Sequence, residues 1–201
     1  MAYSDFTLAE LKQRFRLTVS EATNLFADVA EADLPPVLSA LLARYLPLAV
    51  NVNTEKARSE LLIAPILIEL MLLHRDRISY FSGIDFTVDE AAGLKGRCDY
   101  ILARSPELLA LTAPVCVLVE AKNENIVGGI PQCLAEMVAA QKFNKDQPPE
   151  SAVFGVVTTG MLWRFLKLEG TTAAVDAVQY PIESVRKIFG ILSRMALGSA
   201  S

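Results

Sequence analysis

One apolar run that ends in charged residues constrains this chain more than any other feature. Residues 115–119 read Val-Cys-Val-Leu-Val and pass directly into Glu120-Ala-Lys122. A continuous apolar run rich in β-branched residues is typical of a central strand buried on both faces. Charges placed against such a run cost several kcal/mol unless they are paired or bound to a metal. The run therefore predicts a central strand whose end carries a charged site.

A third charged residue interrupts the preceding predicted strand, residues 97–103, at Asp99. Strand periodicity puts Glu120 and Lys122 on one face, about 7 Å apart. If the two strands are neighbours, Asp99 and Glu120 can converge on one hard cation such as Mg²⁺, which takes oxygen ligands. Such an ion polarises a phosphoryl oxygen and activates a water molecule. A lysine beside the ion can hold that water in line for attack and offset phosphate charge.

The rest of the pattern predicts one domain, residues 1–201, with an α/β fold, a mixed sheet and helices on both faces. Residues 5–50 read as a helical extension, in which Phe6-Thr7, Ser20 and Pro35-Pro36 each open a helix and the last helix ends near Pro47. A long helix follows Asn53-Thr54 and should kink at Pro65. The other expected strands are 78–81, 85–88, 152–158 and 162–168, and the other expected helices are 128–144 and 183–197.

Composition excludes several classes of chemistry. His74 is the only histidine, so a multi-histidine zinc site has no support. A serine triad would have to use His74, and no GxSxG motif supplies its serine. No GxxxxGK[ST] or GxGxxG motif is present, so a phosphate-binding loop has no support either. The position of His74 after a leucine-rich stretch favours a helix end. Three cysteines without CxxC spacing, and an N-terminus without a secretory pattern, predict a cytoplasmic protein. The stretches 34–50 and 61–73 are interrupted by proline or charge, so no membrane span is expected.

The order of these elements resembles the PD-(D/E)XK nuclease superfamily. A helix with Glu60, a strand with Asp99 and a buried run into Glu120-Ala-Lys122 are followed by a helix, as in the αβββαβ core of that superfamily. The likeness spans residues 54–168, and a C-terminal helix at 181–197 follows it. The segment Thr158-Thr-Gly-Met-Leu-Trp-Arg-Phe is also similar to the domain that opens type I restriction motor subunits.

The resemblance implies a metal-dependent nuclease and a set of site residues. Its catalytic residues would be Glu60, Asp99, Glu120 and Lys122, its metal ligands Asp99, Glu120 and Ala121, and its cofactor Mg²⁺ or Mn²⁺. Gln132 matches the first half of a Gln-xxx-Tyr motif that binds substrate in some lineages. The tyrosine position holds Glu136, which would repel phosphate or face solvent. Arg97-Cys98 precede Asp99, where the family often has proline or glycine.

Two functions from different classes remain open. The first is a Mg²⁺-dependent nuclease that hydrolyses DNA phosphodiester bonds by metal-activated water. The second is a weakly active or inactive nuclease-fold module that binds nucleic acid or protein, favoured by the net charge of −4 and the lack of a basic run. The 52% hydrophobic content also predicts a homo-oligomer interface. Trp163 is expected to be a packed hairpin aromatic, and Lys142, Asn144 and Lys145 a solvated helix end.

Overall fold

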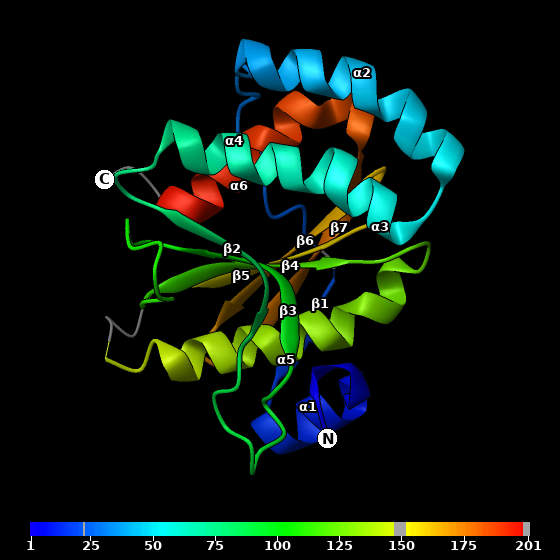
Figure 1. Cartoon of the computed structure of the whole chain (residues 1–201). Coiled ribbons are helices and arrows are strands. Elements are labelled where there is room, and N and C mark those ends of the chain that lie inside the picture. Colours follow the sequence, from blue (N-terminus) through cyan, green and yellow to red (C-terminus); the bar gives the residue numbers. More distant parts are fainter. Residues whose placement is uncertain (22, 147–151, 199–201) are drawn as a thin grey trace.

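The protein has a mixed sheet with helices on both faces, as the sequence predicts, and the sheet has seven strands (Figure 1). The computed structural model describes residues 1–21, 23–146 and 152–198. The strand order is β1-β7-β6-β5-β4-β3-β2. The pairs β1–β7 and β4–β5 are parallel and the other four pairs are antiparallel. The strands are β1 Thr18–Ser20, β2 Ser79–Asp85, β3 Arg97–Ala103, β4 Val115–Ala121, β5 Val153–Thr158, β6 Leu162–Glu169 and β7 Thr172–Pro181.

The helices divide between the two faces of the sheet. Helices α2, α4 and α6 cover one face, and α1 and α5 lie on the other (Figure 1). The α-helices are α1 Leu8–Phe15, α2 Pro36–Val52, α3 Glu55–Arg58, α4 Ala64–Leu73, α5 Ile126–Phe143 and α6 Val185–Leu197. Short segments η1 Tyr3–Asp5 and η3 Ile182–Ser184 are 3₁₀-helical, and η2 Ser59–Ile63 is π-helical.

Strand β4 is the centre of the molecule. All seven of its residues are buried. Leu118 packs in the core on the α5 side of the sheet, whereas Val117 and Val119 pack in the core beneath α4 and α6. The predicted central strand is thus confirmed, because residues that face both layers must all be apolar until the strand ends.

The predicted long helix forms as three consecutive segments, α3, η2 and α4. Thr54 caps it by accepting a hydrogen bond from the amide of Ala57 at 3.2 Å. The expected distortion at Pro65 takes the form of the π-helical segment directly before it. There the amide of Ala64 donates to the carbonyl of Ser59, five residues back. Proline has no amide to donate and crowds the carbonyl four residues earlier, so a wider turn accommodates it. The helix ends at His74, as expected.

The N-terminal region is only partly helical, contrary to the prediction for residues 5–50. Thr7 caps α1 as expected, but the helix predicted after Ser20 is wrong. Strand β1 ends at Ser20, and the described residues 23–34 that follow contain no helix. Thr23 accepts from the amide of Ala177 at 3.1 Å, and the amide of Leu25 donates to Asp176 at 3.3 Å. These long-range contacts with β7 outweigh the local apolar spacing that suggested a helix. Helix α2 also runs past Pro47, which lies on its exposed side, and ends before Asn53 in the left-handed conformation.

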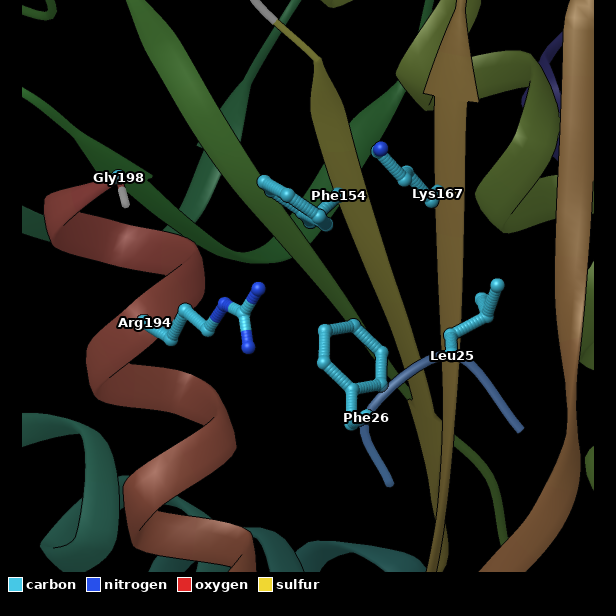
Figure 2. Close-up of a pocket in the computed structure, with 6 residues that line it drawn as sticks. All are labelled: Leu25, Phe26, Phe154, Lys167, Arg194 and Gly198. Atoms are coloured by element: carbon cyan, nitrogen blue, oxygen red, sulfur yellow. The ribbon is translucent and has the colours of Figure 1, made fainter. Parts of the chain in front are cut away.

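The segment after β1 instead bounds a small pocket on the sheet. Leu25 and Phe26 cross β5 and β6, and a cavity of about 100 Å³ lies between them, Phe154, Lys167, Arg194 and Gly198 (Figure 2). Its two cations already have carboxylate partners, because Arg194 pairs with Asp28 at 2.6 Å and Lys167 with Glu169 at 2.9 Å.

Two strand predictions also need correction. One strand, β2, forms where two were expected at 78–81 and 85–88, because the chain continues through Gly83 at φ +61° and no turn forms at Ser82-Gly83. β2 ends at Asp85, so the strand predicted for residues 86–88 is wrong. Strand β7 was not expected. It pairs antiparallel with β6, and its sequence of alanines and a buried Asp176 gives a weak strand signal.

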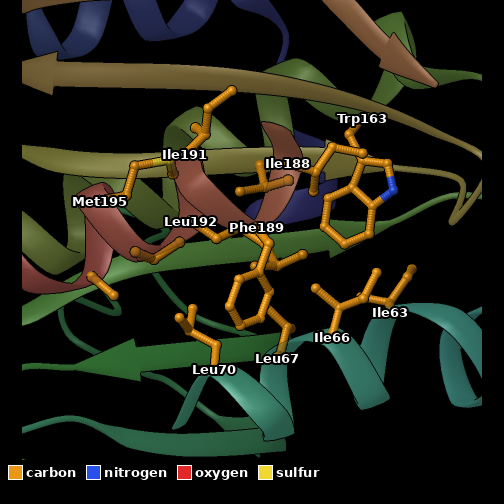
Figure 3. Packing of buried hydrophobic residues seen from close by; sticks show 14 of the residues in the cluster. Ile63, Ile66, Leu67, Leu70, Trp163, Ile188, Phe189, Ile191, Leu192 and Met195 are labelled. Atoms are coloured by element: carbon orange, nitrogen blue, oxygen red, sulfur yellow. The ribbon is translucent and has the colours of Figure 1, made fainter. Parts of the chain in front are cut away.

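The C-terminal helix closes the larger core, as predicted. Trp163 is fully buried between α6 and α4 and its ring nitrogen donates to the carbonyl of Gly160 at 3.1 Å, so its expected packing role is confirmed (Figure 3). Among the described residues no helix is both long enough and apolar enough to cross a membrane. Helix α2 leaves Val37, Leu48, Val50 and Val52 about half exposed, and the homo-oligomer interface stays a prediction.

Candidate active site

The strands β3 and β4 separate at one end, and Asp99 occupies the fork. Their last paired residues at this end are Tyr100 and Val119, so beyond them the amide of Ala121 has lost its β3 partner. The Asp99 carboxylate replaces that partner by accepting a hydrogen bond from the Ala121 amide at 2.8 Å. On its other side β4 stays paired with β5, through Lys122 and Thr158. An acidic side chain is therefore fixed at the end of the central strand.

A cleft of about 350 Å³ opens at this fork. Asp99 and Ala121 line it, and Glu60 reaches it from η2, as predicted. Glu60 is 59% exposed and pairs with Lys56 at 2.6 Å, so it shares the cleft with Asp99 without contacting Glu120 or Lys122. The lining residues are Glu55, Lys56, Ser59, Glu60, Ala64, Ser82, Gly83, Arg97, Asp99, Tyr100 and Ala121.

Glu120 and Lys122 leave β4 on the side that faces α5. Lys122 donates to Glu120 Oε1 at 2.5 Å and to Gln132 Oε1 at 3.0 Å. Its stem passes Gly129, where a Cβ would lie 3.0 Å from Lys122 Cγ. Glu120 and Lys122 therefore form an ion pair in the structure. The two residues of this pair flank Ala121 in the sequence, and Ala121 itself lines the cleft.

Glu136 extends this chain of contacts into the core. The amide nitrogen of Gln132 donates to Glu136 Oε1 at 3.2 Å. Glu136 is fully buried and does not face solvent, which corrects one of the two expectations for it. Helix α5 packs flat against the sheet, so this position points inward. One signal was present in the sequence, since Glu136 is the single charge in the otherwise apolar stretch 133–140.

Three acids, Asp99, Glu120 and Glu136, have raised pKa values. Burial and then the charge of Asp99 raise the pKa of Glu120 to about 7. Burial likewise raises the pKa of Asp99, although the Ala121 amide and the charges of Lys122 and Arg97 oppose it. Glu136 has a pKa well above its ordinary range, because of burial and the nearby Glu120. Partial burial alone would lower the pKa of Lys122, but Glu120 and Asp99 outweigh it and the pKa is raised. Three acids and one lysine thus form one electrostatic cluster.

Arg58 joins the helix that carries Glu60 to the strand that carries Lys122. Its guanidinium donates to the side chain of Asn53 and to both the carbonyl and the side chain of Asn123. Only 6% of Arg58 is exposed. Sequence reasoning did not identify this residue, because an arginine on a helix gives no sign of a partner 65 positions away.

The predicted solvated helix end is wrong for Asn144. Its side chain is buried and bonds both the amide and the carbonyl of Val115, at 2.8 and 2.7 Å. Lys142 pairs with Asp89 at 2.7 Å, and Lys145 is exposed. Asn144 therefore fixes the start of β4 against the end of α5, far from the cleft.

The donor set suits a hard cation. Asp99 and Glu120 offer carboxylate oxygens and Ala121 can offer its main-chain carbonyl, which are ligands that Mg²⁺ and Mn²⁺ accept. Glu120 Oε2 is buried without a hydrogen-bond partner in the described chain. Within the described ranges, no group of three or more histidine, cysteine or acidic side chains is arranged so that it could bind a metal ion. The predicted set needs only two such side chains.

Neither the family models nor the curated proteins with which the chain was compared give a match.

Proposed function

We propose that this protein is a Mg²⁺-dependent nuclease with a PD-(D/E)XK core that hydrolyses DNA phosphodiester bonds. The observation that carries the proposal is Asp99 held in the fork of β3 and β4, beside Glu120 and Lys122. The element order supports it. A helix is followed by the antiparallel strands β2, β3 and β4, then by α5 and by β5 parallel to β4.

Each residue has a distinct task in this proposal. Asp99 and Glu120, with the carbonyl of Ala121, would hold the cation, and Glu60 faces the same cleft. When bound, Mg²⁺ withdraws charge from a phosphoryl oxygen and acidifies water. Lys122 would leave its partner Glu120 and place its ammonium against the charge that develops in the transition state. Gln132, which accepts from Lys122, restricts where that ammonium lies.

The alternative is a binding module with little or no catalysis, and the charge of the cleft favours it. Three acids, Glu55, Glu60 and Asp99, line the cleft against two cations, Lys56 and Arg97. Without a bound cation such a surface repels a phosphate backbone. A bound divalent ion reverses that balance, so the two functions can be distinguished by their dependence on metal.

All three cysteines are buried and free, which fits our proposal of a cytoplasmic protein.

A cleavage assay tests the proposal. Duplex, single-stranded and branched DNA are incubated with wild type, Asp99→Ala, Lys122→Ala and the control Lys145→Ala in Mg²⁺ or Mn²⁺. We expect no cleavage by Asp99→Ala and a turnover lowered roughly 10²–10³-fold in Lys122→Ala, with metal binding retained. Lys145→Ala, which removes an exposed lysine, should match wild type. The proposal fails if wild type cleaves none of these substrates faster than Asp99→Ala does.

A further inference from the structure

Arg97 is the cation of the cleft that has no partner. Lys56, the other cation, is held by Glu60 at 2.6 Å. The Arg97 guanidinium makes no ion pair or hydrogen bond with another residue in the described parts of the chain, and the residue is exposed. An arginine carries five donors, so a free guanidinium beside three carboxylates has its donors directed to solvent or to a ligand.

The backbone of β2 makes room for this side chain. Gly83 adopts φ +61°, and a Cβ there would lie 3.0 Å from Arg97 Nη2 and 3.2 Å from Nε. The guanidinium therefore lies across the neighbouring strand at a position where most other residues would be strained. Both residues line the cleft. This arrangement fixes the charge at the cleft wall.

Asp99 stands two residues further along β3, on the same cleft. Two residues of a strand span about 7 Å, so a ligand held by the Asp99 site also lies within reach of the Arg97 side chain. The positive charge of Arg97 acts on Asp99 across this distance. A planar guanidinium binds the oxygens of a phosphate in pairs, which a lysine ammonium does not do.

We infer that Arg97 binds a phosphate of the nucleic-acid substrate at the wall of the cleft, beside the cation site at Asp99. This inference rests on the proposed function and adds the residue that recognises the substrate backbone. A phosphate contact of this kind positions the strand and carries no base preference. Arg97 is thus a substrate-binding residue, and its loss weakens binding of all sequences alike.

The test measures binding of a fluorescein-labelled 20-base-pair DNA duplex, and of its single strand, by fluorescence anisotropy. Wild type, Arg97→Gln, Arg97→Lys and the control Lys95→Gln are compared in Ca²⁺, a hard cation that takes the same oxygen ligands. Lys95 is a matched control because it lies two residues away but pairs with Glu90 at 2.6 Å outside the cleft. Titrations between about 50 and 200 mM salt give the slope of log Kd against log salt for each variant.

We expect Arg97→Gln to weaken binding about tenfold or more. The salt slope should fall by about 0.9 for the duplex or about 0.7 for the single strand, the effect of one lost phosphate contact. The affinity of Arg97→Lys should lie between those of wild type and Arg97→Gln, and Lys95→Gln should bind as wild type does. Equal Kd and slope for Arg97→Gln and wild type, or equal losses in Arg97→Gln and Lys95→Gln, overturn the inference while leaving the cleavage result standing. Absence of DNA binding by wild type overturns it as well. Cleavage by Asp99→Ala at the wild-type rate refutes the proposed function alone.

Discussion

At Glu120 one carboxylate oxygen is held by Lys122 and the other is buried without a partner in the described chain. Buried polar atoms are nearly always bonded, so an exception marks a proton, a water or an ion. The same is true of Glu136 Oε2. Two acids with unmet oxygens, close to a third at Asp99, make this end of the sheet costly to fold in its fully ionised form. A bound cation would relieve that cost.

Glu136→Gln should make the metal-free protein more stable at pH 8. Glu136 has a folded pKa above its unfolded value, so it takes up a proton on folding, and stability falls as pH rises from the unfolded toward the folded pKa. Glutamine keeps the size of the side chain and has no charge to bury. In EDTA we expect the melting temperature of the variant to exceed that of wild type by at least roughly 2–4 °C, the effect of about 1 kcal/mol.

The advantage should shrink as pH falls toward about 4.3, the pKa of the unfolded-state carboxyl, because below it the wild-type carboxyl is protonated in both states. The control is Glu124→Gln, because Glu124 is exposed. Equal melting temperatures of wild type and Glu136→Gln across this range would show that Glu136 is not held in its neutral form.

Single residues were predictable where a charge breaks an apolar strand. Asp99, Glu120 and Lys122 were found this way. The structure pairs Glu120 with Lys122 and places Asp99 near enough for its charge to raise the pKa of Glu120. Of the three, only Asp99 lines the cleft. Arg97 was noticed only as a departure from a family pattern. Its place beside Gly83 and in the cleft depends on the tertiary structure, which a local sequence pattern does not show.

Helix α5 approaches β4 and β5 closely at Gly129. A Cβ there would lie 2.7 Å from Val157 Cγ1 and 3.0 Å from Lys122 Cγ. Real side-chain carbons do not approach this closely, so a larger residue must move the helix or the lysine. Gly129 thus connects the packing of an element to the place of the Lys122 ammonium.

Gly129→Ala should impair cleavage more than folding. The overpacked contact should cost about 1–3 kcal/mol of stability. The displaced lysine should lower turnover at least about tenfold, since small displacements of catalytic groups have large effects. Cleavage kinetics and thermal melts check both, with Val127→Ala, on the exposed side of the same helix, as control. Wild-type turnover in a folded Gly129→Ala variant would show that the position of Lys122 does not matter for catalysis.

Elements were predictable where their own sequence determines burial. The strands β3, β4, β5 and β6 were expected close to their observed bounds, because their apolar runs are long and rich in β-branched or aromatic residues. Strands β1 and β7 were not, because they pair with each other across more than 150 residues. In addition, β1 has only three residues and β7 contains three alanines and an aspartate. Such strands are stabilised by their neighbours more than by their own propensity.

At the scale of the whole molecule, the site lies where two layers meet the end of the sheet. The helical segments α3 and η2 bring Glu60 and Arg58 from one face, and α5 brings Gln132 and Glu136 from the other. The fork of β3 and β4 separates these two groups and holds Asp99 between them. The overall α/β class followed from the sequence, but the fork did not, since a local pattern does not show where two strands stop pairing.

The most direct test of the cation site is a crystal of the protein soaked in Mn²⁺ and measured for anomalous scattering. We predict one strong peak between the carboxylates of Asp99 and Glu120, with oxygen ligands at roughly 2.0–2.3 Å. In the same crystals Lys122 should have left Glu120, and Asp99→Ala crystals should lack the peak. A Mn²⁺ peak at other carboxylates of the surface, with none at Asp99 and Glu120, would contradict the account.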